Sequence, residues 1–277
     1  MSVESNLKSL FSLEGKIVLI TGAAGGIGAA LSTGMAGVGA IMCNCDINRS
    51  GLDELTSAIA QEGNTARSFI MDVRDRNSIQ AAVDAVIGEF GRIDVLVNVA
   101  GINKREGFLD VTDETYERIM DINLKSVFLV SQIVVIHMMK RRTGSIINIG
   151  SHNATAMLGG CAIYGATKSG VVAFTRAMAV EWAEWGIRAN AISPGHIMTP
   201  LTQVTWDHPT RGDYLRERIA MRRPGKPEEL LGLTILLASD ASGYMTGANY
   251  ILDGGCLAGG APWDFDSAYR AKDGDGV

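Results

Sequence analysis

The chain has 277 residues, a formal net charge of −5, 47% hydrophobic residues and 20% charged residues. The acidic balance argues against a nucleic-acid-binding protein, since phosphate binding requires a basic surface. No proline- or serine-rich linker and no internal repeat divides the sequence, so we expect a single domain over residues 1–277.

The N-terminus lacks the apolar region of a signal peptide. The longest apolar stretch, 127–139, is interrupted by Ser131, Gln132 and His137, and is too short and too polar to span a bilayer. We therefore expect a cytoplasmic protein without a membrane partner.

The four cysteines fit no zinc or redox spacing, and no cluster of histidines predicts a metal site. We expect reduced thiols. Cys43 and Cys45 alternate on a predicted strand and are expected to face opposite sides of it.

Apolar runs rich in Val, Ile and Leu recur along the chain, as in parallel strands that are buried on both faces. The predicted strands are 16–21, 40–45, 66–71, 93–98, 145–149, 187–192 and 250–252. The predicted helices are 27–38, 52–61, 78–90, 115–139, 163–185 and 227–237. This alternation predicts an α/β fold: a Rossmann-type, doubly wound parallel sheet of about seven strands with helices on both faces.

Two segments depart from this alternation. Residues 198–224 follow a predicted strand and contain Pro200, Pro209 and several arginines, which is typical of a mobile substrate lid. The tail, 256–277, is irregular, and we expect its Trp263 and Phe265 to help close the pocket.

A glycine-rich turn follows the first predicted strand. Gly22, Gly26 and Gly28, with Ile27 between the last two, end the strand and open a helix. Glycines allow a tight turn and a close approach of the backbone to phosphates, and the helix N-terminus offers unpaired N–H groups. This context predicts a site for the pyrophosphate of a dinucleotide.

Asp46 ends the second predicted strand, 18 residues after Gly28. At this spacing a carboxylate meets the adenosine ribose, where it accepts hydrogen bonds from both hydroxyls and repels a 2′-phosphate. NAD is therefore favoured over NADP. Arg49 is close enough to neutralise a phosphate, which leaves NADP possible, and Asp46 as a helix cap is the alternative role.

Two further strand ends complete the predicted cofactor site. Asp72, through its side chain or through the amide of Val73, is placed to bind the adenine edge. Asn98, Ala100 and Gly101 follow the fourth strand, where small residues let the chain pass under the adenosine. A plain strand-end turn explains this last segment equally well.

A second group of residues suits proton transfer. Oxidation of a secondary alcohol needs a base for the hydroxyl proton, and the pKa of a free tyrosine, about 10, is too high for an efficient base. Lys168 lies four residues after Tyr164 on one helix face, and its ammonium is expected to lower the tyrosine pKa. Ser151 is placed to bind the substrate oxygen. Together with the glycine turn, this set predicts a nicotinamide-dependent alcohol dehydrogenase or ketone reductase.

At this point the chain resembles the short-chain dehydrogenase/reductase family over roughly residues 12–255. The motifs occur in the family's order: Thr-Gly-x-x-x-Gly-x-Gly at 21–28, Asn-x-Ala-Gly at 98–101, Asn123, Ser151 with Tyr164-x-x-x-Lys168, and Pro194-Gly195. One departure is Val99, where the family usually has a second asparagine. No member of the catalytic set is affected.

The resemblance implies further roles. Tyr164 and Lys168 also contact the cofactor, with Lys168 on the nicotinamide ribose, and Asn123 binds water and passes protons from Lys168 toward solvent. Pro194, Gly195 and Ile197 run beside the nicotinamide, and Thr199 bonds its carboxamide. The resemblance also implies a homotetramer, in which apolar or small residues of the two long helices meet: Val130, Ile133, Val134, Gly170, Ala173 and Ala177.

The residues expected around the substrate are polar. Arg105 follows the fourth strand and, with Ser151, Asn153 and His196, forms the candidate substrate set; His152 and Lys104 add to it. A polar mouth favours a polyhydroxylated or carboxylated substrate, and the chain looks most like the gluconate, sugar and polyol dehydrogenases of the family. The alternative for Arg105 is an exposed loop charge.

Two other functions stay open. A 3-oxoacyl-carrier-protein reductase would present a basic patch such as 140–142 to its acidic partner, although Asp46 disfavours the NADPH that this activity usually uses. That patch equally suits a helix C-terminus. The other function is a non-catalytic dinucleotide-binding sensor or scaffold.

Overall fold

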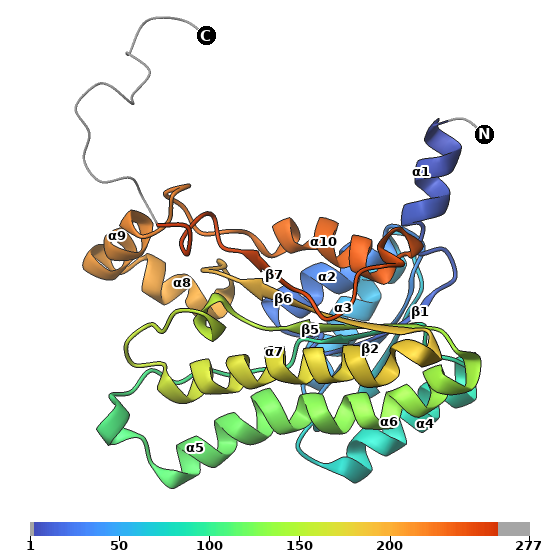
Figure 1. The fold of residues 1–277 in the computed structure, drawn as a ribbon, viewed down its shortest axis with the longest axis horizontal. Helices are drawn as coiled ribbons and strands as arrows, with labels where there is room; N and C mark the ends of the chain where they lie inside the picture. The colour runs from blue at the N-terminus through green and yellow to red at the C-terminus, as the bar shows by residue number, and fades with distance from the viewer. Residues whose placement is uncertain (1–2, 260–277) are drawn as a thin grey trace, which may run out of the picture.

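A parallel sheet of seven strands forms the centre of the protein (Figure 1), in a computed structural model that describes residues 3–259. The strand order is β3-β2-β1-β4-β5-β6-β7. The strands are β1 (Ile17–Thr21), β2 (Ile41–Asp46), β3 (Ala66–Ile70), β4 (Val95–Asn98), β5 (Gly144–Ile149), β6 (Ile187–Pro194) and β7 (Asn249–Leu252). The predicted Rossmann-type fold is confirmed.

Helices cover both faces of the sheet. They are α1 (Val3–Phe11), α2 (Gly26–Ala36), α3 (Arg49–Gln61), α4 (Arg76–Phe90), α5 (Asp113–Met120), α6 (Ser126–Arg141), α7 (Ala162–Trp182), α8 (Pro200–Trp206), α9 (Pro209–Glu217) and α10 (Leu231–Ala238). Helices α2, α3 and α10 lie on one face of the sheet, and α4, α6 and α7 lie on the other (Figure 1). The buried side chains of each group form a separate core layer. The N-terminal helix α1 was not predicted.

The position of β1 in the sheet determines where a ligand can bind. From β1 the chain moves outward to β2 and β3, then returns to pair β4 with the other edge of β1. Thr21 at the end of β1 therefore lies between Cys45 and Asn98. A reversal of this kind opens a crevice at the carboxyl ends of the strands, where open α/β sheets bind ligands.

The single long helix expected at 115–139 is divided by a π-helical turn, Asp121–Lys125, between α5 and α6. The whole helical stretch, Asp113–Arg141, has 29 residues and is long and apolar enough to cross a membrane, but 56% of its most apolar window is buried inside the protein. Its length was underestimated from the sequence. Val130, Ile133 and Val134, expected at a subunit interface, are instead packed in the core.

The segment expected as a lid folds into α8 and α9. Trp206, Leu215 and Ile219 form a small core of their own, and Met198 and Cys256 pack against it. The lid thus contacts the turn that follows β7. Trp263 and Phe265 of the irregular tail, which we expect to help close the pocket, lie outside the described residues.

The expectation for Cys43 and Cys45 was wrong. Residues two apart in a strand point to the same face, and both thiols lie buried in the same core layer as α4 and α6. Both are free cysteines. Burial raises the pKa of Cys43 to about 12, so this thiol stays protonated.

Candidate active site

Two adjoining cavities lie at the carboxyl ends of the strands. The first, which we call the groove, has a volume of about 680 Å³ and is lined by the glycine turn, Asp46, Asp72, Val73, Ala100 and Gly101. The second, the polar pocket, has a volume of about 240 Å³ and is lined by Ser151, Asn153, Tyr164, Lys168, Pro194, Gly195 and His196. Ile27, Gly101 and Thr199 line both, so one elongated ligand can extend from the groove into the pocket.

The glycines of the turn are required by its packing. Gly22 has a positive φ of 68°, and a Cβ there would lie 2.8 Å from the Cα of Ala100. A Cβ on Gly28 would lie 2.1 Å from the carbonyl oxygen of Gly22. The N-cap residue of the next helix, α2, is Gly25. Glycine has no side chain that could accept a hydrogen bond from the first N–H groups of the helix. These features fit a bound pyrophosphate.

Asp46 is held in place by two backbone amides. Its carboxylate accepts hydrogen bonds from Ala24 N and Asn48 N, each at 3.0 Å. The alternative role of Asp46 as a helix cap is wrong, because the side chain of Asn48 caps α3 by accepting from Gly51 N. Arg49, the first residue of α3, is exposed.

Asp72 is engaged by a neighbouring arginine. Arg74 donates to both of its carboxylate oxygens, at 3.0 Å and 2.7 Å, and these hydrogen bonds hold the pKa of Asp72 below its usual value. The carboxylate is therefore already paired. The sequence offered the Asp72 side chain or the Val73 amide as the hydrogen-bonding group for the adenine edge. Because the carboxylate is paired with Arg74, the Val73 amide is the better candidate.

Asn98 does not line either cavity, and its prediction as a cofactor contact needs correction. Its buried carboxamide donates to Ser131 Oγ at 3.1 Å and to Asn148 Oδ1 at 2.8 Å, which ties β4 to α6 and β5. Thr21, which the sequence analysis did not single out as a contact, holds this segment instead. Its hydroxyl accepts hydrogen bonds from the amides of Val99 and Ala100. This contact links β1 to the chain that lines the groove.

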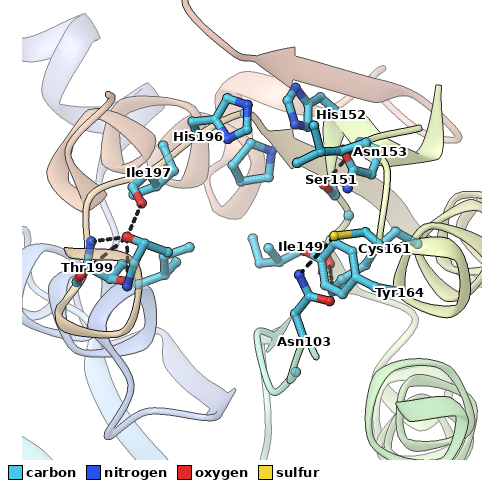
Figure 2. Close-up of a pocket in the computed structure, with 18 of the residues that line it drawn as sticks. Asn103, Ile149, Ser151, His152, Asn153, Cys161, Tyr164, His196, Ile197 and Thr199 are labelled. Atoms are coloured by element: carbon cyan, nitrogen blue, oxygen red, sulfur yellow. Dashed lines mark hydrogen bonds between the residues drawn. The ribbon is translucent and has the colours of Figure 1, made fainter. Parts of the chain in front are cut away.

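Ser151, Tyr164 and Lys168 meet in the polar pocket (Figure 2). The hydroxyl of Ser151 lies close enough to Tyr164 to lower the pKa of its phenol. Lys168 Nζ lies 5.7 Å from the centroid of the tyrosine ring and donates to the carbonyl oxygen of Ile149 at 2.8 Å. The three side chains come from the end of β5 and from α7, so the sheet and one helix fix their relative positions.

Burial controls the pKa of both ionisable members of this set. Desolvation raises the pKa of Tyr164, and the hydroxyl of Ser151 opposes that change. Desolvation also lowers the pKa of Lys168 to about 8. Lys168 is not among the groups that shift the tyrosine pKa, so the expectation that it would lower this pKa is not met in the protein alone, where desolvation dominates.

Asn123 lies in the π-helical turn, fully buried, and outside the lining of both cavities. Its Nδ2 donates to Ile102 O and its Oδ1 accepts from Ile102 N, both at 2.8 Å. A Cβ built on Gly101 would lie 3.4 Å from Asn123 Oδ1 and 3.6 Å from Lys168 Nζ. Asn123 thus holds the loop after β4 against the lysine.

The candidate substrate residues surround the polar pocket. Figure 2 draws Ser151, Asn153 and Tyr164 on one side, Thr199 on the other, and His196 near His152. The buried Oδ1 of Asn153 has no hydrogen-bond partner within residues 3–259. It is therefore an acceptor available to a ligand.

The two cations after β4 behave differently. Arg105 lines the pocket and is exposed. Lys104 instead pairs with Glu106 at 2.5 Å and donates to Thr115 at 3.2 Å. Only Arg105 of this pair is placed to reach a ligand in the pocket.

The basic patch at 140–142 lies at the amino ends of the strands, opposite the cavities. Arg141 pairs with Asp94 at 2.7 Å, just before the start of β4, and Arg142 stacks on Trp185. Both cavities lie at the carboxyl ends of the strands. A partner bound to this patch would therefore face away from the pocket.

Comparisons with known proteins agree with this geometry. A family model described as "Enoyl-(Acyl carrier protein) reductase" matches residues 22–256. A D-threitol dehydrogenase from Mycolicibacterium smegmatis is 40% identical, over 88% of this chain and 94% of that protein. A 3-oxoacyl-(acyl-carrier-protein) reductase from Thermotoga maritima is also 40% identical, over 88% of this chain and 99% of that protein.

Among solved structures, a gluconate 5-dehydrogenase from Burkholderia cenocepacia in complex with NADP and tartrate superimposes with a TM-score of 0.88. It is 36% identical and covers 91% of this chain and 99% of its own. The chain belongs to the short-chain dehydrogenase/reductase family, whose members here are oxidoreductases acting on CH–OH groups.

Proposed function

We propose that this chain interconverts the secondary alcohol and the ketone of a sugar acid or polyol, with NAD as its preferred cofactor. The observation that carries the proposal is the convergence of Ser151, Tyr164 and Lys168 on a polar pocket that continues into the groove. A substrate oxygen at Ser151 and Tyr164 would therefore lie beside the end of an extended dinucleotide. The names of the relatives support the substrate class.

The acid/base role falls to Tyr164. In alcohol oxidation its phenolate takes the hydroxyl proton while Ser151 holds the oxygen, and in ketone reduction its phenol returns that proton. The bound nicotinamide supplies the hydride acceptor or donor, and in its oxidised form it adds the positive charge that an ionised Tyr164 needs in this buried setting. Lys168 holds the cofactor ribose, and Asn123 keeps the adjoining loop in place.

The dinucleotide is assigned to the groove. The glycine turn and the start of α2 hold the pyrophosphate, Val73 meets the adenine, and Ala100 and Gly101 pass under the adenosine. Pro194, Gly195 and Ile197 flank the nicotinamide, and Thr199, whose hydroxyl also caps α8, bonds its carboxamide.

Asp46 carries the preference for NAD. Two amides fix its carboxylate at the end of β2, where it can accept from ribose hydroxyls and would repel a 2′-phosphate. The Burkholderia relative was solved with NADP, so the two cofactors need direct comparison. Arg49 is the residue that would favour NADP.

The substrate contacts are the polar groups at the pocket that lack other partners. Arg105 can bind a carboxylate through two parallel hydrogen bonds. Asn153 Oδ1 can accept from a hydroxyl, since the described residues offer it no donor. His196 lines the same cavity. An anionic, hydroxyl-rich substrate satisfies all three, and tartrate in the Burkholderia structure is a small molecule of this class.

A 3-oxoacyl-carrier-protein reductase is the second candidate, favoured by the Thermotoga relative of equal identity. The 140–142 patch lies away from the pocket, so a carrier protein docked there could not deliver its acyl group to the pocket. This position argues against the second candidate. The presence of Ser151, Tyr164 and Lys168 together in the pocket argues against the hypothesis of a non-catalytic sensor. Turnover of any alcohol would exclude the sensor.

The deciding experiment is a panel of aldonates, polyols, neutral sugars and a 3-oxoacyl thioester, each with NAD and with NADP, followed by the absorbance of the reduced nicotinamide. We expect the highest kcat/KM with an aldonate or polyol and NAD. Turnover of the thioester alone would establish the second candidate instead.

A homotetramer is also proposed. Apolar side chains remain exposed on the outer helices, Phe128 and Ile136 on α6 and Val180 on α7, with the small Ala173 and Ala177 beside them in sequence. Burial between subunits would remove such surface from water. Light scattering at micromolar concentration should give four chains, and a monomer would contradict the proposal. The free thiols among the described residues support a reducing compartment such as the cytoplasm.

A further inference from the structure

His152, His196 and Cys256 meet beside the polar pocket, and each offers one ligand atom within 4.8 Å of the others. They lie 44 and 60 residues apart in the sequence. His152 follows β5, His196 follows β6 and Cys256 follows β7. Because these three strands are neighbours in a parallel sheet, their carboxyl ends bring the side chains together.

We propose that His152, His196 and Cys256 form a binding site for a thiophilic divalent cation of the Zn²⁺ class. Two imidazoles and one thiolate are the ligand set that Zn²⁺ accepts, with a fourth position left for water or a ligand. The site shares His196 with the proposed substrate contacts, but metal binding can be tested without any turnover. The proposal departs from the expectation, drawn from sequence spacing, that the chain holds no metal site.

The distances allow such a site after a small adjustment. With Zn–N near 2.0–2.1 Å and Zn–S near 2.3 Å, ligand atoms around one tetrahedral ion lie roughly 3.3–3.6 Å apart. Ligand atoms at the 4.8 Å limit must therefore approach one another by roughly 1.2–1.5 Å. The two imidazole rings already contact each other edge to face, with centroids 4.7 Å apart (Figure 2).

The histidine nitrogens are available for a metal. His152 is only 7% exposed, and its buried Nδ1 has no hydrogen-bond partner in the described part of the chain. A buried polar atom of this kind calls for a partner that the structure does not contain. His196 is partly buried beside it and lines the polar pocket.

The thiol is held at the site by a short turn. The carboxylate of Asp253 accepts hydrogen bonds from the amides of Gly255 and Leu257, at 2.9 Å and 2.7 Å. Cys256 therefore lies in a turn that the Asp253 carboxylate closes. Asp253 also offsets part of the positive charge that Arg105 and Arg218 place at His196. A cation bound here would thus find a carboxylate close by, and both histidines would direct its open position to the pocket.

Cobalt substitution tests the site directly. Titration of the apoprotein with Co²⁺ should produce tetrahedral d–d absorption and a thiolate-to-cobalt charge-transfer band in the near ultraviolet. The band should disappear in Cys256→Ser. His152→Gln and His196→Gln should each weaken Co²⁺ and Zn²⁺ affinity by at least about 10-fold, measured by titration calorimetry.

Matched controls identify the thiol and exclude unfolding. Cys161→Ser removes a thiol that lines the pocket but lies outside the proposed ligand set, and it should keep the band, as should His137→Gln on α6. Circular dichroism checks that each variant is folded. Absence of the band in the wild type, its survival in Cys256→Ser, or its loss in Cys161→Ser would overturn the proposal.

Discussion

The ammonium of Lys168 donates a hydrogen bond to the carbonyl oxygen of Ile149, at 2.8 Å, where β5 ends. This contact anchors a buried cation between the sheet and the ring of Tyr164. Burial disfavours the charge of this lysine and lowers its pKa. The consequence is a measurable dependence of stability on pH.

Lys168 should make the folded state more stable as pH rises above about 8. Its pKa is lowered from its usual 10.5 to about 8 in the folded protein. Between these values the unfolded chain binds a proton that the folded chain has released, so the free energy of unfolding increases with pH, by at most about 1.4 kcal/mol per pH unit.

Urea denaturation at pH 7.0 to 9.5, compared between the wild type and Lys168→Met, isolates this contribution. The difference in unfolding free energy should move in favour of the wild type across that range. Lys140→Met, at an exposed position on α6, serves as the control and should show a smaller trend. A difference that stays constant would contradict a lysine pKa near 8.

Tyr164→Phe should lower kcat by at least about 100-fold, the usual contribution of general acid–base catalysis, while the dinucleotide still binds. Wild-type alcohol oxidation should rise with pH and continue to rise above neutrality, because burial raises the pKa of the tyrosine that must ionise. Steady-state rates and cofactor fluorescence provide the readouts. Tyr116→Phe, at an exposed position on α5, is the control, and near-normal turnover in Tyr164→Phe would refute the assignment.

Asp46→Ala should narrow the preference for NAD over NADP, because it removes the carboxylate that repels a 2′-phosphate. It should also weaken NAD itself, since the hydrogen bonds to Ala24 N and Asn48 N are lost. The measurement is kcat/KM with each cofactor, with Asp53→Ala on α3 as a matched control. A wild-type preference for NADP would point to Arg49 as the dominant contact.

Arg105→Ala should raise KM for an aldonate more than for a neutral polyol, because the guanidinium pairs with a carboxylate. Lys104→Ala provides the control, since that neighbouring cation is already paired with Glu106. Michaelis curves for both substrates decide the point. Equal small effects on both would leave Arg105 as a solvated loop charge.

Gly28→Ala should destabilise the fold and abolish dinucleotide binding, since the new Cβ would lie 2.1 Å from Gly22 O. Overpacking usually costs about 1–3 kcal/mol. Gly88→Ala on α4 is the matched control: its Cβ meets no atom within 4 Å, so we expect a gain of about 0.5–1 kcal/mol. Thermal melts with and without NAD compare the two variants, and similar losses in both would reject the packing argument.

The sequence predicted the sheet well because each strand is a continuous apolar run between helical patterns. It also predicted which strand ends would meet, since parallel strands share one carboxyl edge. Gly22, Asp46, Ser151 and Tyr164 accordingly line the two cavities. Their assigned roles stay predictions that the experiments above address.

The features that could not be predicted from the sequence depend on contacts between side chains that are distant along the chain. Asn98 fits a family motif, yet its carboxamide turns inward to Ser131, which no local pattern indicates. The apolar side chains of Val130 and Val134 suited a subunit interface as well as a core, and only the packing of α6 decides between them. The cluster of His152, His196 and Cys256 has no sequence spacing that could have revealed it.

The π-helical turn at Asp121–Lys125 sets a limit on length changes in this helix. A turn of this kind holds one residue more than an α-helical turn, so removing a single residue there would restore a regular helix. Removing one residue from the start of α6 itself would instead rotate everything downstream of the deletion by about 100° relative to α5. Ser131 would then leave Asn98. The register of this helix therefore tolerates point substitutions far better than a deletion of one residue.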